Sequence, residues 1–196
     1  MANVSPYGIK PIINQYESVQ INPYYIPANL AYALTAGTPV VLTVGSSNPN
    51  STINSMSYPV GTLPAIARAT GGDGNKLLGT IVGFGLRPTD ILGNNITNPA
   101  NTENVAWVAD FVGQEFSGVM NGVLNLADLG KNFNLTIGTV NTFMDRDSTS
   151  INITPSASAT AQIRVKEVSN SPLNSATVTG PEVVFSINNH SYSPNT

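Results

Sequence analysis

Short apolar runs separated by turn-forming residues recur along most of the chain, which is the pattern of an all-β protein. The clearest alternation lies between Gln162 and Val168, where Ile163 and Val165 are flanked by polar neighbours. A period of two residues predicts a half-buried strand with one polar face. Runs rich in β-branched and aromatic residues predict the other strands of the body, and together these cover residues 39–44, 63–69, 77–84, 105–112, 115–119, 133–137, 150–153, 161–168 and 182–187.

Helical periodicity is nearly absent from the chain. One short helix is expected around residues 124–129, with Gly130 as its C-terminal stop. Many short strands and almost no helix predict an all-β fold, an antiparallel β-sandwich or barrel of jelly-roll-like type. We expect this body to span residues 28–187, followed by a loose polar tail over residues 188–196.

The first 27 residues differ from the body, because they hold four of the 14 prolines and four of the seven tyrosines. Proline at this density prevents a helix and favours extended backbone, so residues 1–27 are expected to form an extended N-terminal arm. Tyrosine combines a large apolar face with a polar tip and is common in interfaces. The alternative is a segment that folds back over its own sheet. The arm residues expected to contact another protein or subunit are Tyr7, Ile9, Pro11, Tyr16, Tyr24 and Tyr25.

Charged residues are unusually scarce. Asp, Glu, Lys and Arg make up 10% of the chain, against about 25% in a typical globular protein. Asn, Ser and Thr account for 61 of the 196 residues, and no charge lies between Glu17 and Arg68. A surface without mixed charges indicates that much of it is covered by other protein. The alternative is a soluble β-domain that uses Asn, Ser and Thr for solvation.

The same composition argues against several classes of function. A net charge of −3 argues against a nucleic-acid partner, which requires clustered Lys and Arg. Apolar runs are too short to span a bilayer, so no membrane partner is expected, and the N-terminus does not resemble a signal peptide. Cysteine is absent, which excludes disulfides, a thiolate nucleophile and cysteine metal sites.

A search for catalytic chemistry finds little. His190 is the only histidine and lies in the polar tail, where we expect it to be solvated. Asp145 and Asp147 could bind calcium or act as an acid–base pair, but Arg146 between them favours a solvated turn. We therefore expect no catalytic residue, no cofactor and no metal site, and the chain is not predicted to be an enzyme.

Several short segments, taken in order, resemble one family of phage proteins. The opening, residues 5–11 (SPYGIKP), resembles the N-terminal "PYGL(K/R)P" signature of small structural proteins of tailed bacteriophages. Members of this family usually carry an acidic residue before the valine of a Gly-x-x-Val segment, where this chain has Thr38-Pro39. Further similar segments follow at residues 36–40 (AGTPV), 77–84 (LLGTIVGF), 105–110 (VAWVAD), 126–132 (LADLGKN), 144–148 (MDRDS) and 161–168 (AQIRVKEV).

The family resembled is that of the capsid decoration, or cement, proteins. The resemblance implies a structural virion protein on the capsid exterior, bound as an oligomer to the outer surface of the major capsid protein lattice. It implies self-association as well, with a homotrimer favoured over a homodimer. An oligomer that bridges several capsid subunits would gain affinity through multivalency.

Two other functions remain open at this point. One is a carbohydrate- or receptor-binding β-module of a phage head or tail fibre, which would need an aromatic platform. The single tryptophan, Trp107, is expected in a core strand, which counts against this function. The other is a hydrolase with a β-sandwich fold, for which Asp110 and Glu115 would be the carboxylate pair.

Overall fold

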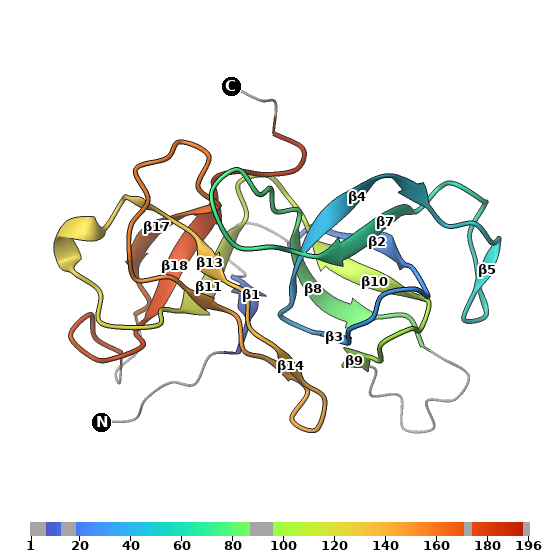
Figure 1. Cartoon of the computed structure of the whole chain (residues 1–196), viewed down its shortest axis with the longest axis horizontal. Helices are drawn as coiled ribbons and strands as arrows, with labels where there is room; N and C mark the ends of the chain where they lie inside the picture. Colours follow the sequence, from blue (N-terminus) through green and yellow to red (C-terminus); the bar gives the residue numbers. More distant parts are fainter. Residues whose placement is uncertain (1–6, 13–18, 87–95, 171–173, 194–196) are drawn as a thin grey trace.

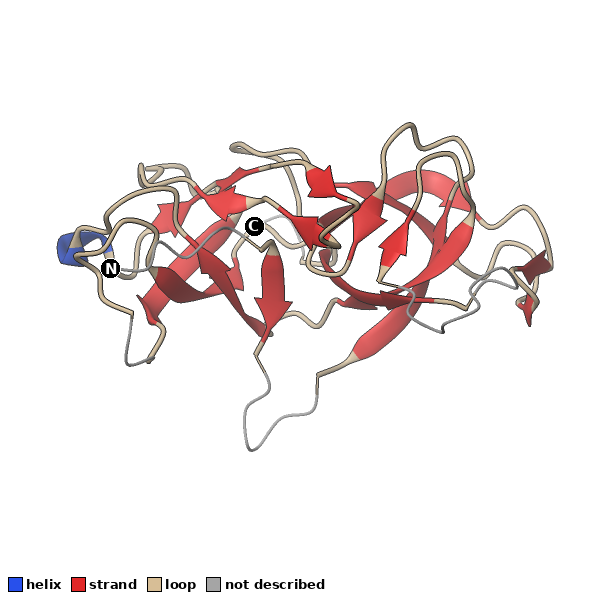
Figure 2. Cartoon of the chain, turned by 90° about the horizontal axis from the view of Figure 1, so that it is seen from below, coloured by secondary structure: helices blue, strands red, loops and turns tan. Residues whose placement is uncertain are grey.

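The computed structural model describes residues 7–12, 19–86, 96–170 and 174–193 of the chain. Within these ranges the chain consists of strands and loops, with one short 3-10 helix, η1 (Leu126–Asp128). The predicted all-β fold is confirmed. Figure 1 shows a barrel on one side and an open sheet on the other, and Figure 2 shows η1 at the end of the molecule opposite the barrel.

The barrel closes on itself through five strands. Four of its five strand pairs are antiparallel, whereas β2 and β7 run parallel and pair only at Tyr25 and Ala65. Apolar side chains fill its interior, including Ile66, Leu78 and Ile81. The strands, in barrel order, are β10 (Asn104–Ala109), β2 (Ile21–Ile26), β7 (Pro64–Arg68), β4 (Pro39–Ser47) and β8 (Gly79–Phe84).

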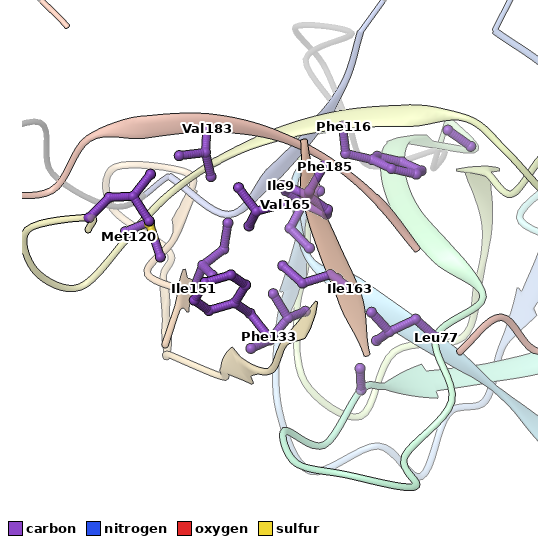
Figure 3. Packing of buried hydrophobic residues seen from close by; sticks show 14 of the residues in the cluster. Ile9, Leu77, Phe116, Met120, Phe133, Ile151, Ile163, Val165, Val183 and Phe185 are labelled. Atoms are coloured by element: carbon purple, nitrogen blue, oxygen red, sulfur yellow. The ribbon is translucent and has the colours of Figure 1, made fainter. Parts of the chain in front are cut away.

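The open sheet is antiparallel throughout and contains five strands. It covers a second core, in which the rings of Phe116 and Phe185 stack with their centroids 6.0 Å apart. Figure 3 shows Phe133, Ile151 and Ile163 gathered beneath them. The strands, in sheet order, are β1 (Ile9–Pro11), β11 (Glu115–Val119), β18 (Glu182–Ile187), β17 (Ile163–Val168) and β12 (Asn132–Phe133).

Four two-stranded ladders complete the described strands, and each of their strands is two residues long. One of them, the β14–β15 hairpin, projects beyond the two larger sheets (Figure 1). The ladders join β3 (Leu34–Thr35) to β9 (Thr97–Asn98), β5 (Thr52–Ile53) to β6 (Met56–Ser57), β13 (Leu135–Thr136) to β16 (Ser150–Ile151), and β14 (Val140–Asn141) to β15 (Arg146–Asp147).

The expected N-terminal arm is corrected by the structure, because its described residues belong to the body. β2 pairs with β10 along its whole length and so closes the barrel, while β1 forms the edge of the open sheet. Pro23 lacks a backbone N–H, but β2 makes only one bridge on its β7 side, so proline fits there. The boundary expected after residue 27 therefore does not separate an arm from a body, and the fold-back alternative describes this segment.

The expected loose tail is also corrected over its described part, residues 188–193. The backbone N–H of Leu77 donates to Asn189 at 2.9 Å, and the Ser191 N–H donates to the Leu77 carbonyl at 2.7 Å. His190 is only 2% exposed, rather than solvated as the sequence predicted. The tail is held because it continues from β18 along the segment that leads into β8.

Candidate interaction surfaces

β1 and the residues just before it hold three of the six residues predicted to contact a partner, and the structure uses all three within the chain. Ile9 is buried in the core of the open sheet, whereas Tyr7 and Pro11 are half-buried. The Tyr7 hydroxyl donates to the Glu182 carboxylate, and the Lys10 ammonium lies 3.9 Å from the Tyr7 ring centroid. Burial, followed by the bond to Glu182, raises the pKa of Tyr7 above its ordinary range.

The tyrosines of β2 are barrel residues rather than exposed anchors. Tyr24 is 3% exposed and Tyr25 is 5% exposed. The Tyr24 hydroxyl donates to Asp110, and the Tyr25 hydroxyl donates to Glu103 at 3.3 Å. Burial is the first cause that raises the pKa of both phenols.

The structure therefore corrects the predicted interface set. The buried members cannot form a contact surface without unfolding the barrel or the sheet, and Tyr16 lies outside the described residues. The sequence signal that led to this prediction, tyrosine together with proline, also fits a buried strand with one free edge. Among the six predicted interface residues, Tyr7 and Pro11 are half-buried, and both line a hollow of about 510 Å³ beside β1.

The most exposed aromatic side chain in the described residues lies elsewhere, at the tip of the β14–β15 hairpin. Phe143 is 95% exposed, and Met144 beside it is 59% exposed. The side-chain oxygen of Asn141 accepts the backbone N–H groups of both residues at 3.1 Å. The tip is therefore an ordered turn that presents apolar side chains to solvent.

A buried ion pair fixes the base of this hairpin. The Asp147 carboxylate accepts from the Arg68 guanidinium at 2.7 Å and from the Thr38 hydroxyl at 2.9 Å. The Asp147 side chain is fully buried, so the solvated turn expected for this carboxylate is corrected. Arg68 belongs to β7 of the barrel, so the pair joins the barrel to the hairpin.

A second exposed feature is a hollow of about 520 Å³ on the outside of the barrel. Trp107 lies in β10 as predicted, but its side chain is half-buried and lines this hollow instead of filling the core. The side chains of Ala106 and Val108, its neighbours in the strand, point into the barrel, so Trp107 points outward. The other lining residues are Asn54, Ser55, Met56, Phe84, Gly85 and Leu86.

Polar groups cluster where the C-terminal segment meets the barrel. Asp110 accepts from Tyr24 and from the Asn22 amide, the latter at 2.8 Å. Nδ1 of His190 accepts the Tyr192 backbone N–H at 3.1 Å. Burial lowers the pKa of His190, and the nearby Asp110 partly offsets this shift.

Within the described residues, the other candidate catalytic and metal-binding groups considered from the sequence are not brought together. Asp110 is buried beneath Tyr24, whereas Glu115 pairs with Lys166 at 2.7 Å on the open sheet, so the two do not form a carboxylate pair. The described ranges contain no group of three or more His, Cys, Asp or Glu side chains arranged for a metal ion. The same ranges hold no helix with the length and apolar character needed to cross a membrane.

Comparisons with protein-family models, with curated proteins and with solved structures found no match for this chain.

Proposed function

We propose that this chain is a structural virion protein that decorates and cements a phage capsid. It would bind the outer surface of the major capsid protein lattice as an oligomer, with a homotrimer favoured over a homodimer. Its place would be the capsid exterior. The proposal needs no cofactor, no nucleic acid and no membrane.

The observation that carries the proposal is the character of the exposed surface. Large apolar side chains are exposed at many places on the described surface, and two of them, Val44 and Phe143, are 95% exposed. Charged residues make up only 10% of the chain. Single exposed apolar side chains are common on protein surfaces, but monomeric soluble proteins usually keep their surfaces charged. A surface of this kind is suited to permanent contact with other subunits.

The segments that resemble decoration proteins, which occur in the same order along the chain, support a capsid as the partner. Two of these segments build the barrel. Residues 77–84 (LLGTIVGF) lead into and form β8, and residues 105–110 (VAWVAD) form most of β10. These adjacent strands carry barrel core residues on one face. The resemblance therefore includes segments that build the fold, and supports the family interpretation beyond the N-terminal signature.

Binding to empty capsids tests the proposal. The purified protein is mixed with DNA-free capsids assembled from the major capsid protein of the same phage, and the mixture is sedimented. We expect the protein to pellet at a saturating, fixed ratio to the capsid protein, and a reconstruction should show added density on the outer lattice. Failure to sediment with either unexpanded or expanded capsids, together with absence from purified virions, would contradict the proposal.

The Trp107 hollow favours a second candidate, a carbohydrate- or receptor-binding module of a phage head or tail fibre. The outward indole, with Asn54 and Ser55 nearby, is an aromatic platform with polar groups, which is the arrangement such a site requires. A glycan array tests it. Binding of a glycan that is lost in Trp107→Ala, while the melting temperature stays close to that of the parent, would support this candidate.

A further inference from the structure

The β14–β15 hairpin has the composition of an interface anchor. Its tip and second strand carry Phe143, Met144 and Arg146, all of which are exposed. Phe, Met and Arg are enriched in protein–protein interfaces relative to the rest of a protein surface. The described part of the chain leaves this tip uncovered, which makes it available to another molecule.

The tip is also held in one conformation before any partner arrives. Asn141 accepts two backbone N–H groups of the turn, and the Thr97 hydroxyl donates to Asp145 at 2.5 Å. The buried pair of Asp147 with Arg68 fixes the base of the hairpin. An anchor that is already ordered loses little conformational entropy on binding.

The hollow beside Trp107 has a matching character. Met56, Phe84 and Leu86 line it together with the indole, so its walls are largely apolar. Its volume of about 520 Å³ leaves room for an aromatic side chain and its neighbour. Leu86 is 62% exposed, which shows that the free chain leaves part of this apolar wall open to solvent.

The charges around the two features are complementary. Arg146 has no ion-pair partner among the described residues. Beside the hollow, the Asn54 amide donates to the backbone carbonyl of Glu103 at 3.1 Å. The carboxylate of Glu103 accepts from Tyr25 but is likewise without a cationic partner in the described part of the chain. Beside Arg146, the Asp145 carboxylate is engaged by the Thr97 hydroxyl. Among the described residues, a cation near the tip and an anion near the hollow that both lack an ion-pair partner favour contact between two copies of the chain.

We propose that the hairpin tip of one subunit inserts Phe143 into the Trp107 hollow of a second copy, with Arg146 facing Glu103. The two surfaces differ, so the contact is head-to-tail and builds a ring when the rotation between subunits closes. A homotrimer is one such ring. This inference rests on the oligomeric part of the proposed function and names the surfaces that would form the oligomer.

Disulfide trapping tests the contact directly, because the chain has no cysteine of its own. Phe143→Cys and Met56→Cys are prepared separately, mixed and oxidised. We expect a covalent dimer that contains one chain of each variant. The control pairs Phe143→Cys with Val44→Cys, whose parent side chain is 95% exposed, more than that of Met56, and lies outside the hollow. Equal yields from the two mixtures would overturn the inference.

Self-association measured by sedimentation gives an independent readout. Phe143→Ser and Trp107→Ala should each raise the dissociation constant of the oligomer by about tenfold or more, as loss of an interface anchor does. Val44→Ser should leave it unchanged. Arg146→Glu should weaken association, and adding Glu103→Arg should restore it. A parent protein that stays monomeric at high concentration would overturn the inference.

Capsid and glycan assays on the same variants separate this inference from the proposed function. If the parent forms the oligomer and the variants lose it, the inference stands even when capsids are not bound. If Phe143→Ser loses capsid binding without a change in mass, the tip contacts the capsid and the inference is wrong while the proposed function stands. If Trp107→Ala loses only glycan binding, the hollow is a carbohydrate site and the inference is also wrong.

Discussion

Asp147 shows how much a single buried residue contributes to the shape of this molecule. Its carboxylate is fully buried and pairs with Arg68, whose side chain is 14% exposed. Two charges removed from water are tolerated when each has its partner, and either one alone is costly. The short spacing of Asp145 and Asp147 in the sequence indicated a local pair, but the partner comes from a strand far away in the chain.

Asp147→Ala should lower the free energy of unfolding by about 3–5 kcal/mol, because it leaves the Arg68 charge unpaired in a buried position. Urea denaturation measures this loss. The control is Lys131→Ala, which removes an exposed pair with Asp128, where the two side chains are 52% and 16% exposed. That change should cost no more than about 1 kcal/mol. Equal effects of the two substitutions would show that the Asp147 pair does not stabilise the fold.

His190 should make stability depend on pH. Its folded-state pKa lies below the ordinary value of 6.5 because the ring is buried, and the groups that act on it or contact it are Asp110, the Leu78 backbone and the Tyr192 ring. As the pH falls below 6.5, the unfolded chain takes up a proton that the folded chain does not. The free energy of unfolding should therefore fall with pH, by at most about 1.4 kcal/mol per pH unit, until the folded-state pKa is reached.

Urea denaturation between pH 7.5 and pH 5.5 measures this dependence. The His190→Gln variant supplies the control, because its side chain does not titrate and the slope over this range should disappear. A slope that persists in His190→Gln would assign the pH dependence to another group.

At the scale of the elements, close packing between β8 and β10 makes one glycine necessary. A Cβ atom at Gly79 would lie 1.9 Å from the carbonyl oxygen of Ala109, whereas one at Gly83 on the same strand would meet nothing within 4 Å. Gly79→Ala should therefore force the two strands apart and cost about 1–3 kcal/mol or more. Gly83→Ala is the matched control, and thermal melts of the two variants should differ clearly.

The longer strands could be predicted from the sequence, whereas the two-residue strands and the proline-containing strand β2 could not. The strands at residues 115–119 and 182–187 match β11 and β18 at both ends, because each holds bulky apolar residues between turn-forming segments. The two-residue ladders leave no periodic pattern to detect. The prolines and tyrosines of residues 1–27 favour an extended arm over the strand β2, and the single bridge of β2 to β7 explains why Pro23 fits there.

The candidate surfaces were harder to predict than the fold. Trp107 lies in its predicted strand, but its outward direction depends on which face of β10 lines the barrel, and its near-continuous apolar sequence conceals that alternation. Phe143 gave no signal, since exposure depends on the hairpin that surrounds it. The burial of His190 depends on a tertiary contact with Leu77. Local pattern does not contain such information.

At the scale of the whole molecule, the N-terminal segment belongs to both parts of the fold. β1 lies in the open sheet and β2 lies in the barrel. The two parts are joined further by the Thr80 hydroxyl of β8, which donates to the Ile9 carbonyl of β1 at 3.0 Å. Loss of this segment should therefore damage both cores together.

Deletion of residues 1–26 should abolish the cooperative thermal transition, because it removes one strand from the barrel and one from the sheet. Circular dichroism and the yield of soluble protein measure the result. A chain that begins at Tyr7 is the control, since it keeps both strands and should melt cooperatively. A soluble, cooperatively melting product of the longer deletion would mean that the segment is dispensable for folding after all.

Closure of the barrel has a consequence for the order of events during synthesis. Ile21 pairs with Ala109 and Tyr25 with Val105, so β2 cannot pair with β10 until the chain has been synthesised as far as β10. The edge strand β1 likewise needs β11, which in turn pairs with β18 near the end of the chain. Contacts this distant in sequence form slowly. A nascent chain therefore cannot close the barrel before Ala109 has been synthesised, and cannot complete the open sheet before β18 has been synthesised.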